Sequence, residues 1–136
     1  MKKVLILLVL ICLALPVFAT NWVEFSYKSY YDEDTWQQKG NYVIVWFKIL
    51  NNNDIPLQKN KKVWYVQSRM IADCGNYKIA PLSSSYYDLQ GKLIDSFDFD
   101  SQKYYSYQSW LSSLSWMNVA PDTMGMEKYN LMCSIR

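Results

Sequence analysis

Two runs of acidic residues come closest, in residue type and spacing, to catalytic chemistry. A pair of carboxylates that face each other across a cleft can cleave a glycosidic bond. Consecutive carboxylates on a loop more often point apart into solvent, and neither run has the spacing of a calcium-binding loop. We therefore predict no catalytic pair and no metal site from these residues, which are Asp32, Glu33 and Asp34 in one run and Asp95, Asp98 and Asp100 in the other.

The composition argues against most enzyme classes. The chain of 136 residues contains no histidine, the side chain that most often transfers protons near neutral pH, binds zinc or assists a Ser or Cys nucleophile. Its four glycines are isolated from one another, so the sequence has no glycine-rich phosphate loop. We expect a protein that is not an enzyme and that needs no cofactor.

The N-terminal segment has the three parts of a secretory signal peptide. Lys2 and Lys3 precede an apolar run over residues 4–15, and a small-residue pattern ends at Ala19. The run is shorter than the roughly 20 residues of a membrane-spanning helix. We predict that residues 1–19 are a signal peptide cleaved between Ala19 and Thr20, which leaves an exported protein without a transmembrane anchor.

Removal of this segment changes the charge balance. It reduces the 14 Lys and Arg side chains to 12, which equals the 12 Asp and Glu side chains. A neutral protein has no general attraction to nucleic acid or to an anionic membrane, so we expect neither as a partner. The six Trp and twelve Tyr could stack on bases or sugars. Because they are spread along the chain, packing in the core and across strands is the favoured role.

Two cysteines remain after the predicted cleavage site, Cys74 and Cys133. An exported protein enters an oxidising compartment, in which an even pair of cysteines usually forms a bond. A redox-active pair would have its cysteines close in sequence, as in Cys-x-x-Cys. The long spacing here predicts one structural disulfide.

Residues 20–136 contain no repeat or linker and predict a single domain. Alternating or continuous apolar runs predict five strands, at residues 22–29, 42–50, 63–74, 77–86 and 92–99. Pro81 predicts a bulge or edge position in the fourth run. Asp88 to Gly91 predict the turn of a hairpin. The expected sheet is antiparallel, with five or six strands.

Helical spacing is confined to the last third of the chain. Residues 108–119 are consistent with either a helix or a strand, because a strand pattern competes with the helical spacing there. After Pro121, three residues share one helical face and Asp122 can cap the helix; they are Met126, Tyr129 and Cys133. The prediction is an α+β fold in which the disulfide ties a C-terminal helix to the sheet.

The order of several short motifs along residues 22–133 resembles the surface-adhesin protein E family of small exported bacterial domains. The motifs are Trp22, Tyr30-Tyr31-Asp32 with Thr35, Val45-Trp46-Phe47-Lys48, Cys74, Tyr86-Tyr87-Asp88 with Gly91, Trp116, Val119-Ala120-Pro121-Asp122 and Cys133. The resemblance implies an antiparallel sheet with a C-terminal helix, a tendency to form homodimers, and, for the founding adhesin, attachment to host matrix and serum proteins. It implies no catalytic residues.

One departure from the founding adhesin concerns its lipid anchor. Lipid attachment needs a cysteine that follows a small residue, whereas Ile11 precedes Cys12 here. We therefore expect a periplasmic or secreted protein. Two functions stay open: an adhesin-like module that binds a protein, and a soluble periplasmic accessory protein, such as an inhibitor or envelope-stress factor, that binds an envelope component.

The segment from Asn51 to Lys62 is the candidate partner-binding loop. It is longer than the usual hairpin connection, and Lys59, Lys61 and Lys62 form a positive spot on a neutral protein. Such a spot suits acidic patches or sulfated glycans of a partner. The alternative is that these lysines keep the chain soluble and protect a sheet edge.

Overall fold

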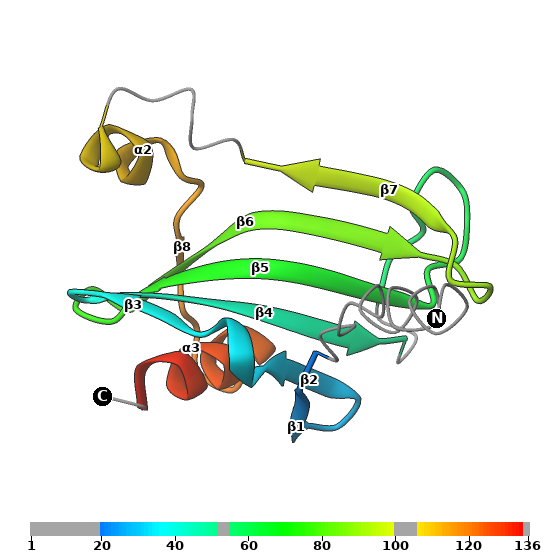
Figure 1. Ribbon diagram of the computed structural model, residues 1–136, viewed down its shortest axis with the longest axis horizontal. Helices are drawn as coiled ribbons and strands as arrows, with labels where there is room; N and C mark the ends of the chain where they lie inside the picture. Colours follow the sequence, from blue (N-terminus) through cyan, green and yellow to red (C-terminus); the bar gives the residue numbers. More distant parts are fainter. Residues whose placement is uncertain (1–19, 52–54, 100–105, 135–136) are drawn as a thin grey trace, which may run out of the picture.

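The computed structural model describes residues 20–51, 55–99 and 106–134, which form an α+β fold (Figure 1). The predicted signal peptide and Asp100 lie outside these ranges. In chain order the elements are β1 (Trp22–Ser26), β2 (Ser29–Asp32), the 3-10 helix η1 (Glu33–Thr35), β3 (Gln37–Lys39), β4 (Tyr42–Leu50), β5 (Tyr65–Asp73), β6 (Lys78–Tyr87), β7 (Leu93–Asp98), α2 (Tyr107–Ser113), β8 (Met117–Asn118) and α3 (Met124–Ser134).

The strands of the described residues form one antiparallel sheet in the order β1-β2-β4-β5-β6-β7. Two short strands lie off this path, since β3 pairs with β4 and β8 pairs with β6. The antiparallel sheet, the C-terminal helix and the disulfide confirm the predicted fold class. The sheet has eight strands, more than the five or six that we predicted.

The long apolar run at residues 42–50 forms β4, at the centre of the sheet between β2 and β5. Because side chains alternate along a strand, Val43, Val45 and Phe47 face α3 and are buried against it. Tyr129 and Met132 contribute the α3 side of this cluster. The first core therefore lies between the sheet and the C-terminal helix.

A second core lies on the other face of the sheet, under α2. Its buried sheet residues are Ile71 of β5 together with Ala80 and Leu82 of β6. α2 contributes Trp110 and Leu111, and Leu114, the residue after the helix, completes the cluster. In Figure 1 α2, α3 and β8 are gathered at one end of the sheet, so among the described residues no α-helix packs on the other end.

The predicted strand over residues 22–29 is wrong, because the chain reverses within it. A turn at Tyr27 and Lys28, with Lys28 at φ 55°, separates β1 from β2, and the two strands pair with each other. The alternation of apolar and polar residues continues through this turn, so the sequence pattern does not reveal it. This hairpin accounts for one of the additional strands.

The bulge predicted near Pro81 is confirmed. Arg69 of β5 opposes Ser83, and the next residue, Met70, opposes Pro81, which leaves Leu82 without a partner in the ladder. The extra residue turns Leu82 into the core under α2, where it is 3% exposed. The predicted turn before β7 is also present, with Gly91 at φ 75°.

Residues 108–119, which we left open between helix and strand, contain both. Trp110 lies in α2, whereas Met117 lies in β8 and is 49% exposed. Leu114 is the residue at which the helix ends, so the segment changes from helix to strand between Trp110 and Met117.

The C-terminal helix α3 forms as predicted, but a different residue caps it. Thr123 accepts a hydrogen bond from the Met126 amide through Oγ1 at 3.2 Å, whereas Asp122 has a left-handed backbone with φ 57°. The helix is fastened to the end of β5 by the Cys74–Cys133 disulfide, with a Cα–Cα distance of 5.6 Å. Tyr129 adds a hydrogen bond from its hydroxyl to the Cys74 carbonyl, at 3.0 Å.

Candidate binding surface

The candidate surface lies on the sheet face opposite α3, toward the end that is distant from α2 and α3. Alternation along β4 places Trp46 and Lys48 on this face, because their neighbours Val45 and Phe47 point into the core against α3. Lys48 opposes Tyr30 of β2 on one side and Gln67 of β5 on the other. It is thus a cation in the middle of the sheet rather than at its edge.

Two aromatic rings lie near the Lys48 ammonium group. Its Nζ lies 5.8 Å from the centroid of the Trp22 ring and 5.0 Å from that of Tyr65. Each such contact contributes about 0.5–1 kcal/mol at an exposed site. Among the described residues Lys48 has no carboxylate within ion-pair distance, so its charge is held by rings and left without an anion.

Tyr65 is itself held by a second ring. It stacks on Tyr87 of β6, with centroids 4.6 Å apart and planes at 13°. Burial raises the pKa of Tyr65, and the neighbouring Tyr87 and Asp88 raise it further, so its hydroxyl stays neutral and can donate a hydrogen bond. We call Trp22, Lys48, Tyr65 and Tyr87 the aromatic–lysine cluster.

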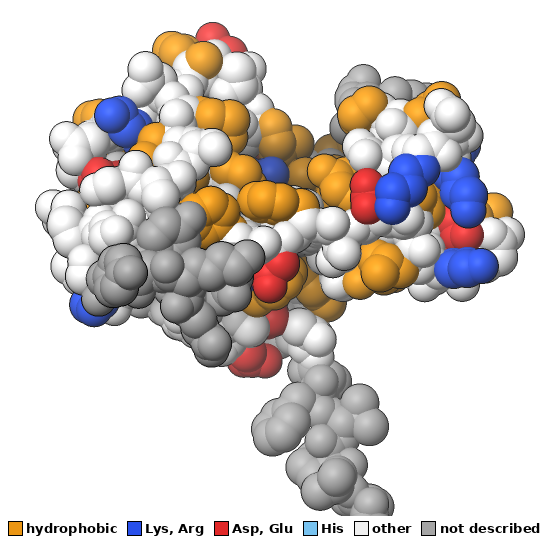
Figure 2. All heavy atoms as spheres, turned by 90° about the horizontal axis from the view of Figure 1, so that it is seen from above, with side chains coloured by type: hydrophobic (Ala, Val, Ile, Leu, Met, Phe, Trp, Pro, Cys, Tyr) orange, Lys and Arg blue, Asp and Glu red, His pale blue; other side chains and the backbone are white. Residues whose placement is uncertain are grey.

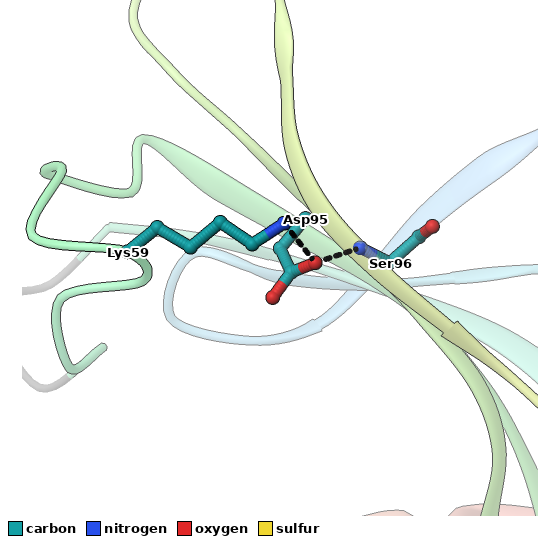
Figure 3. Close-up of polar contacts among 3 residues, drawn as sticks. All are labelled: Lys59, Asp95 and Ser96. Carbon is teal, nitrogen blue, oxygen red and sulfur yellow. Dashed lines mark hydrogen bonds and ion pairs between the residues drawn. The ribbon is translucent and has the colours of Figure 1, made fainter.

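The predicted lysine loop is fastened to the sheet through one of its lysines. Gln58 and Lys61 exchange two backbone hydrogen bonds, and the two residues between them, Lys59 and Asn60, both have positive φ. This geometry is a type I′ turn. From its tip Lys59 Nζ reaches Asp95 Oδ1 of β7 at 2.8 Å, and the Ser96 amide donates to the same oxygen at 3.0 Å (Figure 3).

The three loop lysines therefore differ in what they can do. Lys59 is 63% exposed but paired, and it holds the pKa of Asp95 below its usual value by hydrogen bonding. Lys61 and Lys62 are exposed. The sequence reasoning placed the three residues together and missed the partner of Lys59, because Asp95 is far from it in the chain.

The acidic runs do not form catalytic pairs in the described residues. Asp32 is 2% exposed, and its side chain accepts a hydrogen bond from the Asp34 amide. This contact caps the N-terminus of η1. Asp95 and Asp98 are three residues apart on β7 and so point to opposite faces. Among the residues that the structure describes, no three His, Cys, Asp or Glu side chains are grouped as metal ligands would be.

The aromatic–lysine cluster was not predicted. Its members come from β1, β4, β5 and the end of β6, so only the pairing of these strands brings them together. The available signal was a lone lysine, Lys48, within an otherwise apolar run of nine residues. A cation at such a position needs an exposed face or a set of ring neighbours.

Within the ranges that the structure describes, none of the helices has the length and apolar content that crossing a membrane requires.

The fold resembles that of solved proteins. A crystal structure of Haemophilus influenzae protein E, crystal form II, superposes with a TM-score of 0.54 at 14% identity, over 90% of this chain and 94% of that chain. Protein E from non-typeable Haemophilus influenzae gives 0.50 at 15% identity, over 90% and 82% of the two chains. At these identities the likeness shows a shared fold. No protein with a curated description matches the sequence.

The sequence also matches the family model for surface-adhesin protein E, and the match covers residues 22–134. This range contains every described strand and helix, and it confirms the resemblance drawn from the short motifs. The family is one of surface adhesins and not of enzymes. The chain therefore belongs to the surface-adhesin protein E family.

Proposed function

We propose that this chain is an exported, non-enzymatic binding protein that holds an acidic segment of a protein partner on the aromatic–lysine cluster. The observation that carries the proposal is Lys48, a half-buried cation among rings with no carboxylate partner among the described residues. A partner carboxylate would complete the ion pair, and the rings of Trp22 and Tyr65 would cover its apolar neighbours. Aromatic and cationic anchors of this kind dominate protein interfaces.

The lysine loop has a second role in this proposal. Lys61 and Lys62 are exposed, and they add positive charge at the loop without being part of the cluster. Exposed charges of this kind speed the approach of an acidic partner more than they strengthen the final complex. Lys59 contributes less, because Asp95 already neutralises it.

The family's description as surface adhesins favours a partner outside the cell, and a host matrix protein is the class that we propose. Export follows from the basic start and apolar run of residues 1–19. The mature chain begins at Thr20 and forms a single domain. The homodimer that the family resemblance implies is tested by sedimentation equilibrium of this mature protein.

A binding experiment tests the cluster. The mature protein and its variants are passed over immobilised basement-membrane extract, and rate constants are measured by surface plasmon resonance. Lys48→Gln should weaken binding at least about tenfold, mainly through faster dissociation, because it removes a charged anchor from the contact. The combined variant Lys61→Gln and Lys62→Gln should instead slow association, more at low salt than at high salt.

Lys92→Gln is the matched control, since it removes one exposed positive charge outside the cluster and the loop. Equal thermal midpoints for all variants exclude a folding defect. Binding by Lys48→Gln that equals that of the parent protein would contradict the proposed surface.

A second experiment separates the two cellular roles. Protease added to intact cells should degrade the protein if it acts as an adhesin, because a host partner must be able to reach it. Protection in intact cells and digestion after the outer envelope is opened would instead favour the soluble periplasmic accessory protein.

A further inference from the structure

A hollow of about 410 Å³ lies between α2 and the face of the sheet opposite α3. This volume falls within the range of about 300–1,000 Å³ that is usual for small-ligand pockets. Viewed from the side of β7 and α2, the molecule is concave between its two ends, and hydrophobic side chains are exposed in the concave part (Figure 2). The hollow is at the end of the sheet that carries the helices, whereas the aromatic–lysine cluster lies toward the other end.

The walls of the hollow combine apolar and charged side chains. Ile44, Leu82, Tyr107 and Trp110 supply the apolar surface, whereas Arg69 and Asp98 supply one charge of each sign. Arg69 opposes Ser83, which in turn opposes Asp98, so the two charged residues are on the same face with one strand between them. They do not form an ion pair with each other.

Trp110 provides a buried donor without an acceptor. The residue is 7% exposed, and its indole Nε1 is the one buried side-chain polar atom of the described residues that lacks a hydrogen-bond partner. The neighbouring indole of Trp116 is satisfied, since its Nε1 donates to the Leu111 carbonyl at 2.8 Å. An unpaired buried donor is unfavourable, so Trp110, which lines the hollow, favours an occupant that brings an acceptor within reach of its indole N–H.

Arg69 provides a second, charged donor. It is half-buried, and within the described part of the chain no carboxylate lies within ion-pair distance of its guanidinium. A guanidinium binds a carboxylate through two parallel hydrogen bonds. Asp98 on the other side of the hollow repels a second anionic group, which limits the occupant to one negative charge.

We infer that the hollow is a binding site for a small ligand that joins one carboxylate to an apolar body. The carboxylate takes the donors of Arg69 and Trp110, and the apolar body lies against Ile44, Leu82 and Tyr107. This site is separate from the proposed protein-binding surface, since none of the cluster residues lines the hollow.

The test uses the mature protein labelled with ¹⁵N, in which each tryptophan indole gives its own N–H signal. Trp110→Phe identifies the Trp110 signal by its loss. The probes are 4-phenylbutyrate and 4-phenylbutanol, which share the apolar body and differ in the carboxylate. We expect 4-phenylbutyrate to shift the Trp110 signal with saturation at millimolar concentration or below, and to bind about tenfold more tightly than the alcohol.

Arg69→Gln should reduce the affinity for 4-phenylbutyrate about tenfold and leave the affinity for the alcohol unchanged, because only the carboxylate uses the guanidinium. Lys92→Gln removes a positive charge outside the hollow, and it should change the affinity for neither the acid nor the alcohol. Trp110→Phe should weaken binding of the acid more than binding of the alcohol. Displacement of a fluorescent dye by each probe measures these affinities. The proposal is overturned if the Trp110 signal does not move, if acid and alcohol bind equally, or if folded Arg69→Gln binds the acid as the parent does.

Discussion

Lys128 lies in the layer between α3 and β4, with its Nζ 5.3 Å from the centroid of the buried Phe47 ring. Burial lowers the pKa of Lys128 to about 8, compared with about 10.4 in an unfolded chain. Between these two pH values the unfolded chain binds more protons, so the free energy of unfolding rises with pH there. Below pH 8 the buried charge opposes folding in full.

Replacing this lysine with an apolar side chain of similar length should therefore stabilise the protein. We expect Lys128→Met to raise the free energy of unfolding by about 1–3 kcal/mol at pH 7, and by much less at pH 9.5. Urea unfolding at the two pH values measures the difference. Lys61→Met, at an exposed position, should change little at either pH. An advantage of Lys128→Met that is the same at both pH values would contradict the assigned burial.

The contact between Lys59 and Asp95 makes a different prediction, about a carboxylate at the surface. Lys59 lowers the pKa of Asp95 mainly through its hydrogen bond, and the Ser96 amide lowers it further. Lys59→Gln should raise the pKa of Asp95 toward its ordinary value, as followed by carbon NMR of the carboxyl group. A depressed carboxylate pKa stabilises the folded state at neutral pH, and this contribution is lost as the pH falls through the folded-state pKa.

Lys61→Gln is the matched control for that titration, since it removes a neighbouring charge that does not contact Asp95. If both variants moved the pKa of Asp95 equally, the effect would come from the general charge of the loop and not from the ion pair in Figure 3.

At the scale of elements, the disulfide joins the end of β5 to the last turn of α3 across a sequence separation of 59 residues. Closing a loop of this length restricts the unfolded chain by roughly 4 kcal/mol in the chain-entropy model. Cys74→Ser and Cys133→Ser should each lower the free energy of unfolding by about 2–5 kcal/mol, and the double variant should cost little more than either. Chemical denaturation of the three variants measures this.

Additive effects of the two single variants, or free thiols in the unfolded and unreduced mature protein, would show that the bond does not form. The parent protein treated with reductant is the matched control, because it loses the bond and keeps both side chains. It should unfold at the same denaturant concentration as the single variants.

The sequence predicts an element correctly where the residues of that element alone determine its secondary structure. The sequence predicts β4 because eight of its nine residues are apolar, aromatic or β-branched, which fits a covered strand better than a helix. Sequence reasoning failed at Tyr27 and Lys28, where the turn preserves the strand pattern. It also missed the aromatic–lysine cluster and the hollow, because both depend on the register between strands that are distant in sequence.

At the scale of the whole molecule, the predicted signal peptide can be tested by intact mass. The exported protein should have the mass of residues 20–136 with one disulfide, because cleavage follows Ala19. The unprocessed chain produced in the cytoplasm is the control. A species that retains residues 1–19, or one that carries a lipid on Cys12, would contradict the predicted mature N-terminus at Thr20.

The strand order has a consequence for the time course of folding. Successive long strands, from β4 to β7, each pair with the preceding one, so the sheet can form hairpin by hairpin in the order of the chain. α3 follows all of these strands in the chain and is the last of the described elements. Until it docks, the apolar side of β4 is exposed to solvent and the Cys74 thiol can react with other molecules. Docking of α3 thus covers the apolar face of β4 and brings Cys133 to Cys74, so that the free thiol is replaced by the disulfide in the same step.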